Sequence, residues 1–505
     1  MPTATTPGLY FAVAERPPAP EPLRTDVAGF IGRAARGPVG QAVRVEGLRG
    51  YQAVFGAMET GCITPYAANG YFENDGEVAW IVRVAGVTET AWGALDPISF
   101  LGADTALRVD ASSPGSWANG TTVAINYRRS GSLGAPSIDI AVQPPGEGPE
   151  YLTGLDPDSL ADQVAAQSVF IRVTAFSPPG AAPPAGPQRR AQKLTLTLNG
   201  GADGTPTRQE YLDAARALND QAEPAILSVP DLYTDLPADG DQREILSALI
   251  QRADELRDRL VVLDVTPQAS SAQQALAWLD SVRADNGDSM RAAAAYHPWV
   301  WVPDPAGGAA SPQRTLPPSG HVAGVISRLD RERGAYYTPA NAPLLDAFDI
   351  TTEFADDEQA QLNAGGVNLL RCFRGRGLYV WGGRTGSLDD SRRFVAHRRL
   401  IHRLVRAIRR VAEPLVFDTN GPELWLTLVR AITTVLLAAW RGGGLQGSRP
   451  EEAFQVTCDA TTNSPQQIDQ GMVVCLVSVA PAVPMEFILL RIALSGEGVL
   501  EVFES

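Results

Sequence analysis

Alternation between strand-like and helical segments in the middle of the chain constrains the fold more than any other feature of the sequence. Apolar runs with strand character are separated by stretches that have helical periodicity, and the runs are residues 194–198, 225–229, 260–265 and 292–302. Parallel strands need such a long crossover, whereas antiparallel strands can be joined by a short turn. The sequence therefore predicts an α/β domain with a parallel sheet in this region.

The chain of 505 residues is longer than one hydrophobic core normally supports, so several domains are expected. Residues 177–187 are mostly Pro, Gly and Ala, which is typical of a linker, and the segment before them has β-rich character. The predicted fold class is α/β, in a multidomain α+β arrangement. The predicted divisions are an N-terminal arm (1–24), the first part of an inner domain (25–90), a β-rich outer insertion (91–190), a middle α/β domain (191–350), the C-terminal part of the inner domain (351–494) and a C-terminal arm (495–505).

The net charge of −15 and the isoelectric point near 4.9 argue against a nucleic-acid binder, because neutralising phosphates requires a basic surface. Residues 1–20 lack the basic and apolar regions of a secretory signal, so the chain is expected to stay in the cytoplasm. The longest apolar run, residues 424–440, contains Arg430 and is shorter than the roughly 20 residues that cross a bilayer. This run is predicted to be a buried helix, with no membrane insertion.

No catalytic, cofactor or metal site is predicted. Residues 200–204 form a glycine-rich loop, but they lack the G-x-G-x-x-G spacing and the Gly-Lys-Ser/Thr ending of phosphate-binding loops. His397 and His402 do not have the i, i+4 spacing of a zinc-binding helix. The cysteines form no C-x-x-C pair, which argues against a zinc site or a disulfide framework, and they are Cys62, Cys372, Cys458 and Cys475.

A short strand-like segment stands at each end of the chain, separated from the body by residues that favour an extended spacer or a hinge. Residues 16–22 are Pro-rich and follow the first strand, and Gly496 and Gly498 precede the last one. An isolated strand cannot satisfy its backbone groups and needs a sheet edge to join. The residues predicted to form these inter-subunit strands are Leu9, Tyr10, Phe11, Val13, Val499, Leu500, Val502 and Phe503.

Residues 397–412 predict a strongly amphipathic, cationic helix. Leu400, Leu404 and Ile408 share one face, and the opposite face carries Arg399, Arg403, Arg406 and Arg410. The arginine face is either solvated or contacts an acidic neighbour such as an inner tube or the next subunit. Arginine suits such a contact because its guanidinium pairs with carboxylates through two hydrogen bonds.

Glycine-containing motifs are spread over nearly the whole chain. They are Val27-Ala28-Gly29-Phe30-Ile31-Gly32-Arg33, Ser113-Pro114-Gly115-Ser116-Trp117-Ala118-Asn119, Gly200-Gly201-Ala202-Asp203-Gly204-Thr205, Arg371-Cys372-Phe373-Arg374-Gly375-Arg376-Gly377 and Val380-Trp381-Gly382-Gly383-Arg384-Thr385. In this order and at these distances they resemble the sheath proteins of contractile phage tails and of related contractile injection systems. A sheath subunit is a mechanical part, so its function is expected to depend on interfaces and not on a catalytic pocket.

The resemblance implies a structural subunit that stacks as hexameric rings around an inner tube and contracts to drive the tube outward. Its partners would be further copies of itself, the inner tube protein, and baseplate and terminator or cap proteins, in a phage-tail-like particle assembled in a bacterial cytoplasm. Sheath arms add strands to sheets of neighbouring subunits. The implied fold has a subtilisin-like α/β middle domain, a mixed α/β inner domain and a β-rich outer insertion.

Three alternatives stay open at this point. The sheath of a true phage virion would carry the same motifs, and a non-contractile baseplate protein could share the fold. A subtilisin-like hydrolase would need a Ser-His-Asp triad, in which Asp264 could be the acidic member. However, no serine lies in the Gly-Thr-Ser-Met-Ala context of those enzymes, and likeness of fold does not transfer chemistry.

Overall fold

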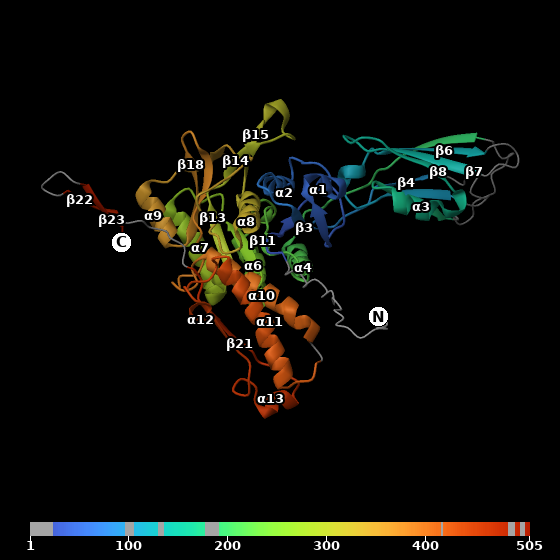
Figure 1. The fold of residues 1–505 in the computed structure, drawn as a ribbon. Helices are drawn as coiled ribbons and strands as arrows, with labels where there is room; N and C mark the ends of the chain where they lie inside the picture. The colour runs from blue at the N-terminus through green and yellow to red at the C-terminus, as the bar shows by residue number, and fades with distance from the viewer. Residues whose placement is uncertain are drawn as a thin grey trace, which may run out of the picture. The chain divides into compact units, whose positions relative to one another are not determined.

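The structure is a computed structural model that describes residues 24–95, 106–129, 136–176, 191–415, 418–482, 490–494 and 500–504 (Figure 1). These residues divide into a large unit, Arg24–His402 with Pro481–Ser505, and a small unit, Arg403–Ala480. The long helix α10 (Val395–Ala412) begins in the large unit and ends in the small one.

A nine-stranded sheet forms the centre of the large unit, and its inner strands are parallel, as the alternation of strands and helices predicts. Its order is β16 (Ala342–Pro343), β19 (Gly377–Trp381), β18 (Val367–Phe373), β13 (Ala293–His297), β12 (Leu260–Asp264), β11 (Ile226–Ser228), β1 (Ala28–Gly32), β3 (Val78–Arg83) and β2 (Ala42–Glu46). The strands at the two margins, β2, β19 and β16, pair in the antiparallel sense.

Strands from three predicted domains join this single sheet, so no boundary between sheets separates residues 25–90 from the middle domain. β1 is buried along its whole length and pairs with β11 on one side and β3 on the other. A strand that is buried on both faces needs a hydrogen-bonded neighbour at each edge, because its backbone groups have no access to water. β1 therefore anchors residues 25–90 in the central sheet.

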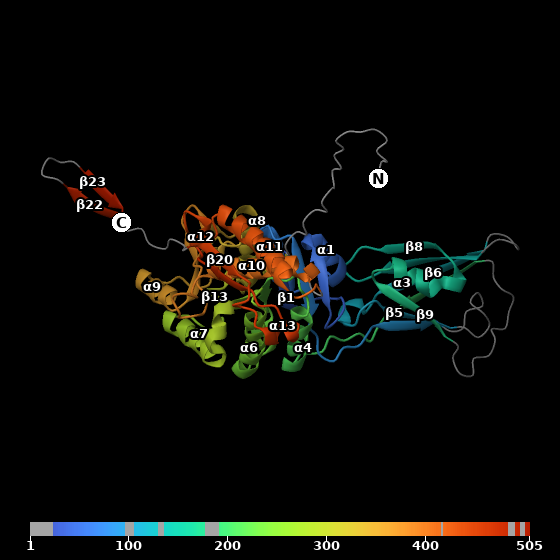
Figure 2. The same cartoon turned by 60° about the horizontal axis from the view of Figure 1, so that its bottom comes forward.

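Helices cover both faces of the sheet, in two layers with separate apolar cores. One face packs against α4 (Arg208–Asn219), α5 (Leu232–Asp235), α6 (Asp239–Leu256), α7 (Ala272–Asn286) and α9 (Asp356–Ala364). The other packs against α1 (Gly47–Phe55), α2 (Thr64–Glu73) and α8 (Ser319–Arg333), with the small sheet of β14 (Val300–Pro303), β15 (Gln313–Leu316) and β17 (Asp349–Ile350). Figure 2 shows α4, α6 and α7 side by side along one face.

The predicted outer insertion is β-rich and has an apolar core of its own. One sheet contains β4 (Trp92–Leu95), β5 (Ala106–Ala111) and β9 (Ile171–Phe176), and the other β10 (Ala191–Thr197), β6 (Thr122–Arg129), β7 (Pro136–Gln143) and β8 (Glu150–Leu155), next to α3 (Leu160–Gln167). β10, which the sequence assigns to the middle domain, pairs with β6 over seven residues instead. The insertion therefore extends beyond residue 190.

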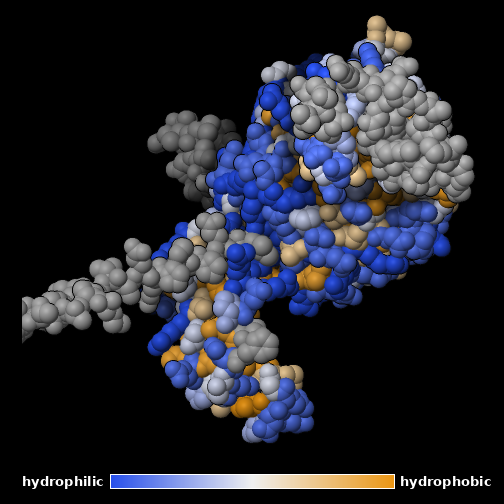
Figure 3. Space-filling model, turned by 90° about the vertical axis from the view of Figure 1, so that its right-hand side faces the viewer, coloured by the Kyte–Doolittle hydropathy of each residue, from blue (hydrophilic) through white to orange (hydrophobic). Residues whose placement is uncertain are grey.

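The small unit contains α11 (Pro422–Arg441), α12 (Pro450–Ala453), α13 (Pro465–Asp469) and a two-stranded sheet of β20 (Phe454–Thr457) and β21 (Leu476–Val479). By length and composition, α11 is the one helix among the described residues that could cross a membrane, and 22% of its apolar window is buried. The helix is predicted to be buried, but α11 buries only one stripe of residues and exposes Leu426. Figure 3 shows hydrophobic residues at the surface of this unit, at the bottom of the view.

The last strand of the chain pairs with a strand of its own molecule. β22 (Leu490–Leu494) and β23 (Leu500–Glu504) form an antiparallel pair with Ile492 opposite Val502. The sequence predicts one loose strand at this end, and the structure has a hairpin, in which apolar residues are opposite each other at two positions, Ile492 with Val502 and Leu494 with Leu500. Two strands alone are at best marginally stable in water, so the hairpin still needs further strands.

Candidate assembly surfaces and buried polar networks

Asp264, the residue considered as the acidic member of a protease triad, caps a helix. It ends β12, is buried, and accepts a hydrogen bond at 2.8 Å from the backbone N–H of Ser319 at the start of α8. Burial raises the pKa of Asp264 to about 7. His297 and His321 are also buried, and burial lowers the pKa of each to about 4. Among the described residues, no group of three His, Cys, Asp or Glu side chains could hold a metal ion.

Open α/β sheets commonly bind ligands at the carboxyl ends of their strands, and at the carboxyl ends of β1 and β11 a buried carboxylate binds backbone groups of the same chain. Asp231 is buried there and accepts hydrogen bonds from the backbone N–H groups of Arg33 at 2.9 Å and Ile63 at 2.6 Å. The hydroxyl of Thr64 donates a further bond to it at 2.6 Å. Burial raises the pKa of Asp231. Asp231 thus binds the N-terminus of α2, which occupies the position of a ligand.

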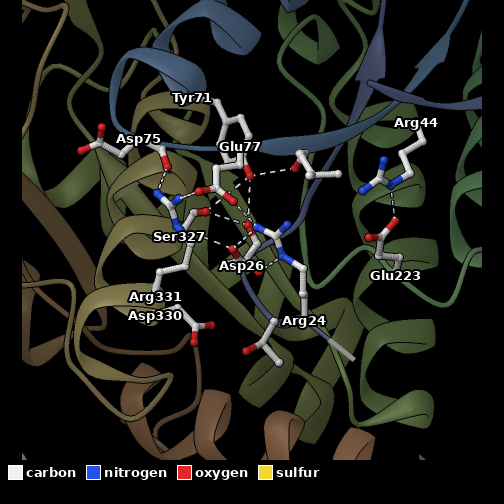
Figure 4. Close-up of polar contacts among 12 residues, drawn as sticks. Arg24, Asp26, Arg44, Tyr71, Asp75, Glu77, Glu223, Ser327, Asp330 and Arg331 are labelled. Atoms are coloured by element: carbon white, nitrogen blue, oxygen red, sulfur yellow. Dashed lines mark hydrogen bonds and ion pairs between the residues drawn. The ribbon is translucent and has the colours of Figure 1, made fainter. Parts of the chain in front are cut away.

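An ion-pair network fixes residues 24–26, where the described part of the chain begins (Figure 4). Arg24 donates to Asp26 at 2.8 and 2.5 Å and to Glu77 at 2.7 Å. Arg331 of α8 pairs with Glu77 and lies 3.7 Å from Asp26. The backbone carbonyl of Asp26 also accepts a hydrogen bond from Ser327 at 2.7 Å. Residues 24–26 are therefore bound to α8.

Arg399 lies inside this region and not on a solvated face. It is 2% exposed, and its Nη2 donates to Asp330 at 2.5 Å and to the carbonyl of Thr25 at 2.8 Å. Arg406 is fully buried, whereas Arg403 is exposed and Arg410 is half-buried. The prediction of one continuous exposed face of four arginines is therefore wrong, because amphipathic spacing does not distinguish water from buried carboxylates. Arg403 and Arg410 remain predicted contact residues.

Arg83 connects the outer insertion to the central sheet. Its guanidinium is 1% exposed and donates to the carbonyls of Gly37 at 2.8 Å and Pro114 at 2.9 Å, and to Asp203 at 2.8 Å. Asp203 in turn accepts hydrogen bonds from Ser116. The motifs at residues 113–119 and 200–205 thus meet at this arginine, which sequence reasoning missed because no local pattern marks it.

The predicted arm residues are only partly within the described structure. Leu9, Tyr10, Phe11, Val13 and Val499 lie outside the described residues. Leu500, Val502 and Phe503 are in β23, opposite Leu494, Ile492 and Arg491. The small unit contains a second two-stranded sheet, and within the described part of the chain no third strand pairs with β20 or β21.

Comparison with known proteins agrees with the sequence motifs. Residues 204–386 match the family model for the phage tail sheath protein central domain, and no curated protein matches the sequence. The contracted helical sheath of the anti-feeding prophage is 22% identical, with a TM-score of 0.59, over 97% of this chain and 100% of that one. The sheath tail protein of Listeria innocua is 12% identical, with a TM-score of 0.62, over 92% of this chain and 96% of that one.

A third similar structure is the contracted sheath complex of the extracellular contractile injection system PVC, which is 19% identical with a TM-score of 0.55, over 98% of this chain and 99% of that one. The protein therefore has the fold of contractile sheath proteins over nearly its whole length. The match of residues 204–386 to the sheath central-domain model and the likeness of fold both confirm the resemblance of the motifs.

Proposed function

We propose that this protein is the sheath subunit of a phage-tail-like contractile injection system. Subunits form hexameric rings that stack helically around an inner tube, and contraction of this polymer drives the tube outward. The observation that carries the proposal is the fold, which is similar to contracted sheaths over almost the entire chain. A heterologous interface that does not close on itself produces a helical polymer, which is the symmetry that a sheath needs.

Strand exchange between subunits supplies the links between rings. The β22–β23 hairpin and the β20–β21 sheet each consist of two strands among the described residues. Both would gain main-chain hydrogen bonds if strands of another copy were added, and such bonds depend little on side-chain identity. The N-terminal arm residues Leu9 to Val13 add a strand in the same way. The links persist while the rings slide and rotate.

The network around Arg24 supports this role for the arm. A strand held by a neighbouring copy transmits force to the residue at which the arm joins its own body. Here that junction is bound by several ion pairs and hydrogen bonds to α8. Tension on the arm is therefore passed to the packed core and does not unravel β1.

The other partners are the inner tube protein and the baseplate and terminator or cap proteins, in a particle assembled in a bacterial cytoplasm. Arg403 and Arg410 are the candidate contacts to an acidic tube or neighbour. Exposed apolar residues of the small unit, among them Leu426 and Leu476, fit a surface that neighbours cover in the polymer. The proposed role is structural and needs no catalytic step.

Electron microscopy of the purified full-length protein tests the proposal. Hollow, ridged cylinders built of hexameric rings are expected. Variants that lack residues 1–22 or 495–505 should remain folded, as judged by circular dichroism, and form no long cylinders. Normal cylinders from both truncated variants would rule out strand exchange, and a wild-type protein that never forms cylinders would rule out a sheath. Particles with a DNA-filled capsid would instead favour a phage virion.

A further inference from the structure

The hairpin of β18 and β19 presents a cluster of arginine and aromatic side chains at the margin of the central sheet (Figure 1, at β18). Its tip is the three-residue turn 374–376, closed by a hydrogen bond from the N–H of Arg376 to the carbonyl of Phe373 at 3.0 Å. Gly375 has φ = 75°, a conformation that favours glycine. Arg374 and Arg376, on either side of it, are both exposed.

Stacked contacts join these side chains into one surface. The ring of Phe373 lies 5.6 Å from that of Tyr379 and 5.1 Å from that of Trp381, both edge to face. The guanidinium of Arg371 lies 5.1 Å from the centre of the Phe373 ring, and that of Arg376 lies 4.7 Å from the centre of the Tyr379 ring. We call these five residues and Arg374 the Arg–aromatic cluster.

Strand alternation explains why the cluster faces outward. Leu370, Leu378 and Val380 point into the core beside α8, and the cluster residues occupy the opposite face. On that same face Leu369 is buried, because it packs in the core beneath the layer of helices that includes α9. Beyond this layer the face is only partly covered, and Trp381 is 39% exposed. Large aromatic residues at a sheet margin would ordinarily be buried, so an additional surface is expected to cover them.

Positive charge exceeds negative charge at this place. Among the described residues, Arg371 has one acidic neighbour, Asp356 at 3.9 Å, and no carboxylate lies within 4 Å of Arg374 or Arg376. The chain as a whole carries a net charge of −15, so further copies of it are a source of complementary carboxylates. Tyrosine, tryptophan and arginine are also the residue types most enriched at the energetic centres of protein interfaces.

We propose that the Arg–aromatic cluster is an inter-subunit docking surface that receives an acidic surface of a second copy of this chain. The inference rests on the proposed function, since it requires a homopolymer. Contacts with the rings of Phe373 and Tyr379 hold Arg371 and Arg376 in place before binding, so these two side chains lose little freedom when a partner binds. Carboxylates of the incoming copy pair with Arg374 and Arg376, and its apolar atoms cover Trp381.

The test compares R374E/R376E with a matched control, R216E/R252E, in the full-length protein. Arg216 and Arg252 are also exposed and lie on α4 and α6, so the control makes the same change in net charge. The critical concentration for cylinder formation, measured by sedimentation, should rise about tenfold or more in R374E/R376E and stay within twofold of wild type in the control. R374Q/R376Q should give an intermediate increase. Unfolding midpoints should match wild type in all three variants.

Cross-linking identifies the occupant. Cys372 is exposed and adjoins Arg371 and Phe373 in β18, although its side chain lies on the opposite face of the strand. A long thiol-anchored photo-cross-linker placed on it, in a mixture of isotope-labelled and unlabelled protein, reaches around the exposed strand end and should join two copies through an acidic peptide. Wild-type cylinders together with an unchanged critical concentration in R374E/R376E would overturn the inference and leave the proposed function intact. Cross-links confined to one copy, or made to another protein of the assembly, would also overturn the inference without contradicting the proposed function. Absence of wild-type cylinders would contradict both.

Discussion

The Nη2 atom of Arg399 lies 2.5 Å from Oδ2 of Asp330, and both side chains are buried. The same nitrogen donates to the carbonyl of Thr25 at 2.8 Å. One guanidinium of α10 therefore joins the backbone of Thr25 to the helix α8. In the proposed sheath these are the elements through which a pull on the arm reaches the body of the subunit.

Arg399→Met should destabilise the large unit by about 3 kcal/mol, because the buried carboxylate of Asp330 loses the charged partner that lies 2.5 Å from it. Urea unfolding measured at neutral pH checks this. Arg208→Met is the matched control, since Arg208 forms exposed pairs with Asp241 and Glu244 and should change stability by less than about 1 kcal/mol. Equal effects of the two substitutions would show that the buried pair has no special role.

Arg83→Met should loosen the attachment of the outer insertion. The substitution leaves Asp203 without its charged partner and frees the carbonyls of Gly37 and Pro114. We expect the free energy of unfolding to fall by about 2–3 kcal/mol. Limited proteolysis should also cleave the chain faster near residues 113–119. Arg108→Met, at an exposed arginine within the insertion, should leave the cleavage pattern unchanged. Unaltered proteolysis of the Arg83 variant would contradict the assigned connection.

Asp264 should make stability depend on pH between about 4 and 7. Its pKa is raised to about 7 in the folded state, so the folded protein holds a proton that the unfolded chain has released, and the contribution to stability falls as the pH rises through this window. The free energy of unfolding of Asp264→Asn, taken relative to that of wild type, should therefore rise by up to about 4 kcal/mol between pH 4 and pH 7. Asp390→Asn, at an exposed position, is the control, and its free energy of unfolding should differ from that of wild type by the same amount at every pH in that range. If the difference is constant for Asp264→Asn as well, the raised pKa of Asp264 is refuted.

Val502→Pro should prevent assembly without unfolding the monomer. Proline lacks an N–H group and cannot take part fully in a strand, so it disturbs either the pairing of β23 with β22 or the edge offered to another copy. Electron microscopy should show no long cylinders, and the thermal midpoint of the monomer should equal that of wild type. Val502→Thr keeps the backbone donor and should assemble. Long cylinders from the proline variant would argue against a role of this strand.

The parallel sheet and the β-rich insertion could be predicted because hydrophobic periodicity and turn residues are local signals. The place of β1 between β3 and β11 could not, since strand order depends on packing between distant segments. For the same reason the sequence predicts an insertion that is too short, because β10 has the pattern of a middle-domain strand and only its pairing with β6 places it in the insertion.

The arginine-rich helix shows a different limit. Its spacing predicts that Arg399 and Arg403 share a face, yet Arg399 is buried and Arg403 is exposed. The partner of Arg399, Asp330, lies 69 positions earlier, on α8, and nothing near Arg399 in the sequence indicates it. By contrast, the Arg–aromatic cluster left a local signal, because Arg371, Phe373, Tyr379 and Trp381 occupy alternate positions of two adjacent strands.

Cryo-electron microscopy of the assembled full-length protein tests the central claim most directly. The claim predicts sheets in which the N-terminal strand and the β22–β23 hairpin pair with strands from other copies, within stacked hexameric rings. A polymer in which both ends of each chain pair only with their own molecule would contradict it.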